Sequence, residues 1–225
     1  MDNKLMQKIQ PFNRREILFQ TSMSHQTAPY IKETGNKLCP YINLDVNMNL
    51  LWGETDEKTD MNYVLTHVEK IMLFGNTLNK LSPEMELVAL CLHHYKNMNS
   101  LYLLTSGSFR FKLFCEIYDY LRNVNPDAKI IHEHCKRLNV GRYVYVCIAQ
   151  TQEIFSDEHL DTYLNALEEW NDPSLFETYG LTPSERKAWK LELFERLFHL
   201  DLANYVFSQL TEEEKEKVNI NRNFM

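Results

Sequence analysis

Glycine is scarce in this sequence, with 6 among 225 residues, and no segment is rich in it. Phosphate-binding loops of the Walker type need several glycines so that backbone N–H groups can approach the phosphates. The sequence therefore excludes such a loop. It also lacks GxSxG and HExxH segments, which removes the motifs of α/β-hydrolases and zinc metalloproteases.

Paired cysteines and long apolar segments are also missing. The five cysteines are odd in number, widely spaced and without a CxxC pair, and most lie in apolar helical contexts. They predict reduced core residues of a cytosolic protein. No segment approaches the about 18 apolar residues that can span a membrane. Residues 1–16 lack the apolar segment of a signal peptide, so we expect a soluble, cytoplasmic protein that does not bind membranes.

Acidic residues outnumber basic ones by 31 to 24, which gives a formal net charge of −7. This balance argues against general binding to nucleic acid or to anionic membranes. At 225 residues the chain can bury a substantial core, as one large domain or two small ones.

Residues 42–50 alternate strictly between apolar and polar side chains, which predicts a β-strand. Its polar face carries Asn43, Asp45, Asn47 and Asn49. Carboxylate and amide oxygens are ligands that Mg²⁺ prefers, and Asp45 is therefore a candidate metal ligand. A single carboxylate rarely holds a divalent ion, however, and the favoured interpretation from spacing alone is a strand facing solvent or a partner.

A second strand is predicted at residues 15–23, and with residues 41–52 it would form a β-hairpin with a long connection. An isolated two-stranded hairpin is marginally stable in water. Its edge is also open to another strand. We therefore expect a homodimer contact or a second polypeptide at this edge.

From about residue 60 the apolar spacing becomes helical. Ser82 followed by Pro83 and Glu84 predicts a helix start at Pro83, and the segments 182–185 and 211–214 are capping boxes that predict starts near 183 and 212. Helices are predicted at 60–79, from 83, and at about 108–123, 127–139, 141–155 and 157–170. The predicted fold class is mainly α with a small β-hairpin (α+β), divided into a β-hairpin region, 1–58, and a helical domain, 59–225.

The end of the helix that begins at Pro83 carries His93, His94 and Lys96. Adjacent histidines on a helix lie about 100° apart and do not easily face one metal. The favoured interpretation is that His94 packs on the apolar side and His93 makes a local hydrogen bond, and the alternative is a polar site. Lys112 and Glu116 are spaced as an i, i+4 surface salt bridge. If they turned inward instead, Lys96 or Lys112 would meet a phosphate.

Four segments, in chain order, carry a resemblance to a known family. They read INLDVNMNLLW, LSPEMELVALCLHHYKN, FRFKLFCEIYDYL and IIHEHCKRLNVGRYVYVCIAQTQEIF. They resemble successive motifs of the uncharacterised bacterial nucleotidyltransferases, which are related to the aminoglycoside nucleotidyltransferases. The resemblance covers about residues 25–155. It implies a fold in which a nucleotide and Mg²⁺ lie over a small mixed sheet.

The resemblance also implies roles for particular residues. Asp45 corresponds to the third metal-binding carboxylate of the family, with Asn43 and Asn47 beside it on the strand. The substrate-binding positions of the helical half correspond to His93, Lys96, Lys112 and Glu116.

The family's G-[GS] helix start and D-x-D carboxylate pair do not precede Asp45, and the earlier acids Asp2, Glu16 and Glu33 are unpaired. Residues 1–58 therefore resemble a remnant of the catalytic sheet. The resemblance implies Mg²⁺-dependent nucleotidyl transfer to an unknown acceptor. Mg²⁺ and a nucleoside triphosphate would bind only if a second polypeptide completes the site. Otherwise the protein would be a degenerate member of the family. The rival hypothesis is a non-catalytic module that binds a protein or peptide. A third is that the catalytic strands are encoded just upstream.

Overall fold

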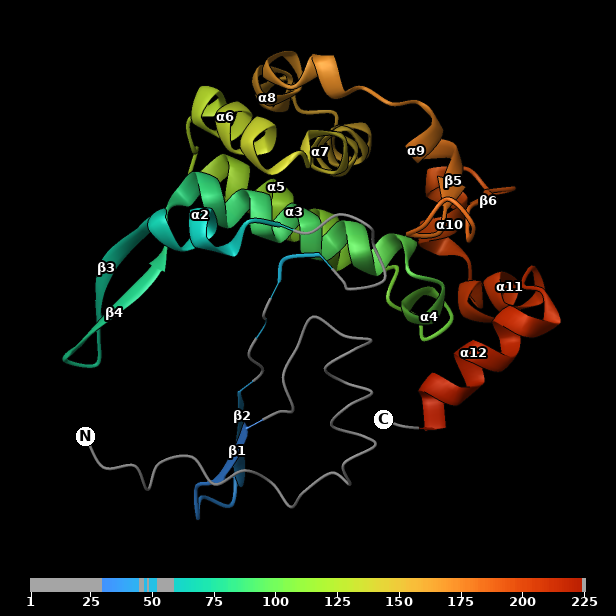
Figure 1. The fold of residues 1–225 in the computed structure, drawn as a ribbon, viewed down its shortest axis with the longest axis horizontal. Helices are drawn as coiled ribbons and strands as arrows, with labels where there is room; N and C mark the ends of the chain where they lie inside the picture. The colour runs from blue at the N-terminus through green and yellow to red at the C-terminus, as the bar shows by residue number, and fades with distance from the viewer. Residues whose placement is uncertain (1–29, 45–46, 48, 52–58, 224–225) are drawn as a thin grey trace. The chain divides into compact units, whose positions relative to one another are not determined.

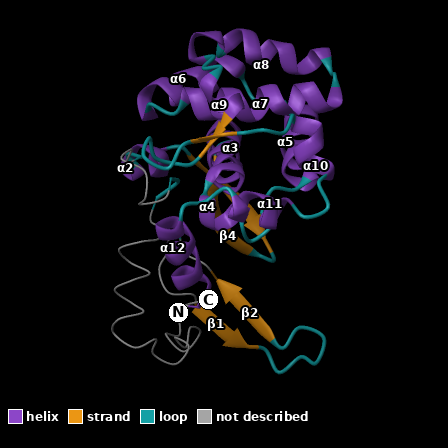
Figure 2. Cartoon of the chain, turned by 90° about the vertical axis from the view of Figure 1, so that its right-hand side faces the viewer, coloured by secondary structure: helices purple, strands orange, loops and turns teal. Residues whose placement is uncertain are grey.

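The computed structural model describes residues 30–44, 47, 49–51 and 59–223. The chain divides into two compact units, Met1–Lys58 and Thr59–Met225, which are described separately. The described residues are mainly helical, with three small antiparallel strand pairs (Figures 1 and 2). This confirms the predicted fold class. That the first unit is the remnant of a larger sheet stays a prediction.

The first unit contains a hairpin of β1 (Tyr30–Glu33) and β2 (Tyr41–Leu44), which pair antiparallel. The strand predicted at 41–52 is thus described at its start, whereas its predicted partner at 15–23 lies outside the described residues. The prediction of a loop through residues 30–33 is wrong. The connection between the strands is shorter than expected, because it runs only from Thr34 to Pro40. The Thr34 N–H donates a hydrogen bond to the Pro40 carbonyl over 2.9 Å.

The second unit begins with a short helix, α2 (Met61–Thr66), followed by a second hairpin of β3 (Val68–Leu73) and β4 (Asn76–Leu81). The predicted helix over 60–79 is therefore wrong after Thr66. Phe74 and Gly75 join the strands with φ angles of 49° and 76°. Two consecutive left-handed residues make the tight turn that matches the twist of a hairpin.

The core of the second unit is built on α3 (Pro83–Asn99), with α5 (Phe111–Asn123), α6 (Ala128–Leu138) and α7 (Gly141–Phe155) packed against one another around it (Figure 1). The predicted start at Pro83 is confirmed, and the Ser82 hydroxyl accepts a hydrogen bond from the Met85 N–H. The other three helices lie within the ranges predicted from apolar spacing, because each has a full buried stripe. A short helix, α4 (Leu101–Leu104), follows α3.

The helix predicted at 157–170 is interrupted. It consists of two 3₁₀ turns, η1 (Glu158–Leu160) and η2 (Glu168–Trp170), on either side of α8 (Asp161–Ala166). The Asp157 side chain accepts a hydrogen bond from the His159 N–H, so the first turn forms separately after α7 ends at Phe155, with Ser156 as its C-cap. These segments cover α6 and α7.

The C-terminal segment contains α9 (Ser174–Glu177), β5 (Thr178–Tyr179), β6 (Lys187–Ala188), α10 (Leu193–Phe198), α11 (Leu202–Ser208) and α12 (Glu212–Asn223). The helix start predicted at 183 is wrong: residues 182–185 form a turn that leads into β6, which pairs with β5. The start at 212 is confirmed, and Thr211 and Glu214 form the predicted capping box.

Three of the cysteines, Cys91, Cys135 and Cys147, are buried as predicted, and all five are free. Cys39 is exposed on the connection between β1 and β2, so the prediction of a core position is wrong there. Among the helices of the described residues, none combines the length and the apolar character needed to cross a membrane.

Candidate functional site

Two of the segments that carry the resemblance meet where α3 packs on α5. His94 Nε2 lies 3.1 Å from Glu116 Oε2, and Lys112 Nζ lies 3.2 Å from Glu116 Oε1. The rings of His93 and His94 are 5.6 Å apart between centroids. We call these four side chains the α3–α5 polar cluster. Glu116 is its centre, because it contacts a residue of each helix.

The cluster runs from the core to the surface. His94 is 1% exposed, whereas the side chains of Glu116 and Lys112 are 39% and 77% exposed. His94 therefore packs on the apolar side of α3, as the favoured interpretation of the sequence has it. The structure adds that this buried imidazole also faces a carboxylate, which the helix periodicity alone does not indicate.

Burial and, secondly, the neighbouring His93 lower the pKa of His94 from 6.5 to about 4, so the imidazole is neutral near pH 7. Among the described residues, neither ring nitrogen has a well-aligned hydrogen bond. The 3.1 Å approach to Glu116 is thus a contact without good hydrogen-bond geometry. A small rotation would let the imidazole donate to the carboxylate.

Lys96 lies one turn beyond His93 on α3 and is buried. Burial lowers the pKa of its ammonium group to about 8. The packing around the His93 ring and, secondly, the charge of Lys96 lower the pKa of His93. Lys96 is therefore close enough to add a second positive charge beside the cluster.

The strand candidates are only partly described. Asp45 lies outside the described residues. Asn43 is in β2, but its side chain is not described, and Asn47 is exposed at an isolated β-bridge. The structure thus brings His93, His94, Lys112 and Glu116 together, and it leaves the role of Asp45 as a prediction.

The described residues alone do not fit a Mg²⁺ site. Among them, no group of three or more His, Cys, Asp and Glu side chains could hold a metal ion. Glu116 is the carboxylate of the cluster, and it already faces the Lys112 ammonium and the His94 ring. A magnesium ion would therefore need ligands from outside the described residues.

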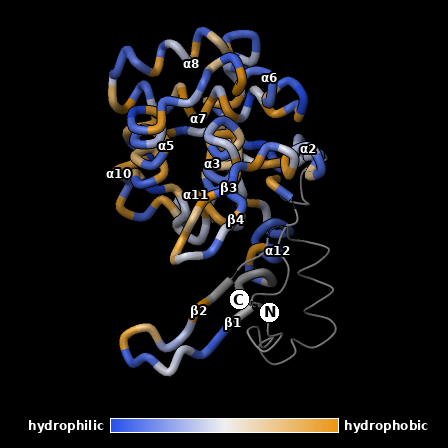
Figure 3. Tube along the Cα trace, turned by 90° about the vertical axis from the view of Figure 1, so that its left-hand side faces the viewer, coloured by the Kyte–Doolittle hydropathy of each residue, from blue (hydrophilic) through white to orange (hydrophobic). Residues whose placement is uncertain are grey.

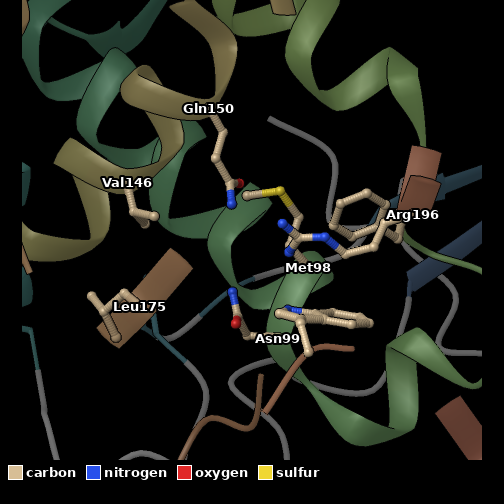
Figure 4. Close-up of a pocket in the computed structure, with 8 residues that line it drawn as sticks. Met98, Asn99, Val146, Gln150, Leu175 and Arg196 are labelled. Atoms are coloured by element: carbon tan, nitrogen blue, oxygen red, sulfur yellow. The ribbon is translucent and has the colours of Figure 1, made fainter. Parts of the chain in front are cut away.

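Sequence reasoning missed two groupings in the second unit. The Tyr63 hydroxyl lies 2.9 Å from His134 Nδ1, and the rings of His67 and His134 are 4.5 Å apart, which joins α2 to α6. Arg196 is buried and lines a small cavity (Figure 4), and its guanidinium group lies over the rings of Trp189 and of the distant Phe109. No spacing in the sequence signals either grouping, since each depends on contacts between distant elements.

Comparison with known proteins gives one match. A family model described as an uncharacterised nucleotidyltransferase matches residues 13–156. No curated protein and no solved structure is significantly similar to the chain. The matched segment contains every candidate site residue and ends directly after α7. Since the match covers more than half of the chain, the protein belongs to this uncharacterised nucleotidyltransferase family.

Proposed function

We propose that this chain supplies the substrate side of a nucleotidyltransferase site. The observation that carries the proposal is the α3–α5 polar cluster. Its members come from two segments that resemble motifs of the family, and Glu116 joins them at 3.1 and 3.2 Å. In a family whose reaction handles phosphates, such a cluster is the natural place for the charged part of the substrate.

Lys112 is the residue best placed to contact a phosphate. Its ammonium group is exposed, and Glu116 holds it at one position on α5. An exposed i, i+4 pair contributes only about 0.3–0.5 kcal/mol, so little stability opposes redirecting the ammonium to a phosphate oxygen. Lys96 provides a second positive charge, and hydrogen bonds between such groups and phosphate are stronger than neutral ones.

In this proposal, catalysis also needs metal-binding carboxylates from outside this chain. Nucleotidyl transfer with two metal ions requires carboxylates that hold both ions. We place Asp45 as one of these ligands and assign the other two to a second polypeptide. Without that polypeptide the chain would not transfer a nucleotide.

Isothermal titration calorimetry with ATP and Mg²⁺ tests the proposal. Wild type should bind, alone or together with a candidate partner, and Asp45→Ala and Lys112→Met should each weaken this binding about tenfold, as expected for the loss of one charge-assisted contact. Lys217→Met is the matched control, because it removes another exposed i, i+4 pair, Lys217–Glu213 at 2.9 Å on α12. Absence of binding to wild type, alone and with candidate partners, would remove the enzymatic function.

A second candidate function is a non-catalytic module that binds a protein. The β3–β4 hairpin favours it, since Met72, Leu73 and Phe74 are exposed near its turn, where Figure 3 shows apolar residues in orange along the hairpin. This function predicts a dimer or a stable heterocomplex in light scattering. A monomer whose melting temperature rises strongly with nucleotide would contradict it.

A further inference from the structure

Helix α2 leads directly into the β3–β4 hairpin, and His67 lies at the junction between them (Figure 1). His67 is the C-cap of α2, and its carbonyl accepts a hydrogen bond from the Ser82 N–H over 2.9 Å, at the base of the hairpin. Its ring lies 4.5 Å from the ring of His134 on α6, between centroids. A histidine of α6 therefore packs against the junction of α2 and the hairpin.

The hydrogen bonds of the two rings suit their neutral forms. His67 Nδ1 lies 2.9 Å from the Tyr63 carbonyl, which can only accept, so this nitrogen carries the proton. His134 Nδ1 lies 2.9 Å from the Tyr63 hydroxyl. His134 is 2% exposed, and its Nε2 has no hydrogen-bond partner among the described residues. Protonated His134 would be a buried cation whose Nε2–H has no acceptor among these residues, which is costly.

The charges around His134 also favour the neutral ring. Burial and, secondly, the nearby His67 lower the pKa of His134 below its usual 6.5. Glu84 of α3 and Glu133 of α6 raise this pKa but do not outweigh the two larger causes. Charging both histidines would place two positive charges on rings 4.5 Å apart, and like charges this close repel. Because a solvated His134 binds the proton more readily, acid favours separation of α2 from α6.

The other contacts of α2 with α6 include an exposed ion pair. Asp60 lies 3.1 Å from Arg137, with side chains 41% and 59% exposed, and exposed pairs of this kind contribute little to stability. The Arg137 guanidinium also lies over the Tyr63 ring, 5.4 Å from its centroid. Val64 is the buried residue of α2, and a helix of six residues has little stability of its own. The position of α2 therefore depends strongly on the histidine pair.

We propose that His67 and His134 form a pH-sensitive switch, which holds α2 and the β3–β4 hairpin on α6 near pH 7 and releases them as the pH falls below about 6.5. Release would expose Val64 and let the hairpin move, together with the exposed apolar residues near its turn. The switch would act independently of any nucleotidyl transfer, because neither histidine belongs to the α3–α5 polar cluster.

Hydrogen exchange of the full chain tests the switch, when mass spectrometry follows it at roughly pH 7.5 and pH 5 and the intrinsic exchange rates are corrected for. In wild type, the amides of residues 61–73 should lose about tenfold in protection between these pH values. One pKa unit of difference between the docked and released states changes the opening equilibrium by about this factor.

Asparagine variants separate titration from hydrogen bonding. His134→Asn keeps an acceptor for the Tyr63 hydroxyl without titrating, and it should largely remove the loss of protection at residues 61–73. His67→Asn keeps a donor for the Tyr63 carbonyl and should show a severalfold smaller loss than wild type. His132→Asn is the matched control, because His132 lies on the same helix but contacts Glu169 at 2.6 Å, and it should show the full loss.

The two histidine variants do not depend on each other. His67 is only partly buried, so His67→Asn decides the outcome even if His134→Asn does not fold. Unchanged protection of residues 61–73 in wild type at pH 5 would overturn the proposal. A loss in His67→Asn equal to that of wild type would overturn it as well.

Discussion

The buried imidazole of His94 should make the stability of the protein depend on pH below about 6.5. Its pKa is about 4 in the folded protein against 6.5 for an unperturbed histidine, mainly because burial disfavours the charged form. Below the higher value the unfolded chain binds the additional proton, so stability is complete above about pH 6.5 and is lost as the pH falls toward 4. The full difference corresponds to about 3 kcal/mol.

Urea unfolding of wild type and His94→Gln, each at roughly pH 7.5 and pH 5, measures this effect. Glutamine retains an N–H that can face Glu116 but does not titrate. Wild type should lose about 2 kcal/mol more than the variant between these two pH values. Titration of all other groups is common to both proteins and cancels in the comparison.

His199→Gln is the matched control, because His199 is an exposed histidine of the same unit. It should lose as much stability as wild type over the same pH interval. If wild type and His94→Gln instead lose the same free energy of unfolding, His94 is not held neutral in the core, and the packing of α3 on α5 is described wrongly.

Three further outcomes follow from particular contacts. A Cβ at Gly141 would lie 2.1 Å from the Trp170 ring, so Gly141→Ala should lower the free energy of unfolding in urea by about 1–3 kcal/mol. In a Trp170→Ala background the same Gly141→Ala change should cost no stability, because the clashing ring is gone. Phe74 has a left-handed backbone conformation, and its side chain is 94% exposed. Because asparagine tolerates this conformation better, Phe74→Asn should raise the free energy of unfolding by about 1 kcal/mol. An unchanged urea midpoint would contradict this expectation. The pKa of the Lys96 ammonium is about 8, so this group should take up about half a proton when a phosphate binds to it near pH 8. Calorimetry in buffers of different ionisation enthalpy detects the uptake, and its absence would exclude a contact between Lys96 and phosphate.

The main helices could be predicted from the sequence because their signals are local. Ser82 and Pro83 mark the start of α3 without reference to the rest of the fold. The β3–β4 hairpin could not, since Val68, Ile71 and Leu78 fit a helical spacing as well as two paired strands. Its turn also lacks the Asn-Gly or Asp-Gly pair that usually indicates a hairpin. Here the left-handed residue before the glycine is a phenylalanine.

In the candidate site, too, only the local contact could be predicted from the sequence. The contact of Lys112 with Glu116 follows from their i, i+4 spacing on one helix. The contact of Glu116 with His94 depends on how α5 packs on α3, which no local pattern determines. The position of Arg196 over Phe109 and Trp189 requires distant parts of the chain to meet, so these residues carry no common signal in the sequence.

The candidate residues of the proposed site divide between the two units. Asp45 belongs to Met1–Lys58, whereas Lys112 and the rest of the α3–α5 polar cluster belong to Thr59–Met225. A double-mutant cycle of Asp45→Ala and Lys112→Met, measured by nucleotide affinity, therefore asks whether one ligand contacts both units. Residues that share a ligand typically couple by about 0.5–3 kcal/mol, whereas independent positions add within about 0.5 kcal/mol. Coupling would join the strand and the cluster into one site, and additive effects would separate Asp45 from the substrate side altogether.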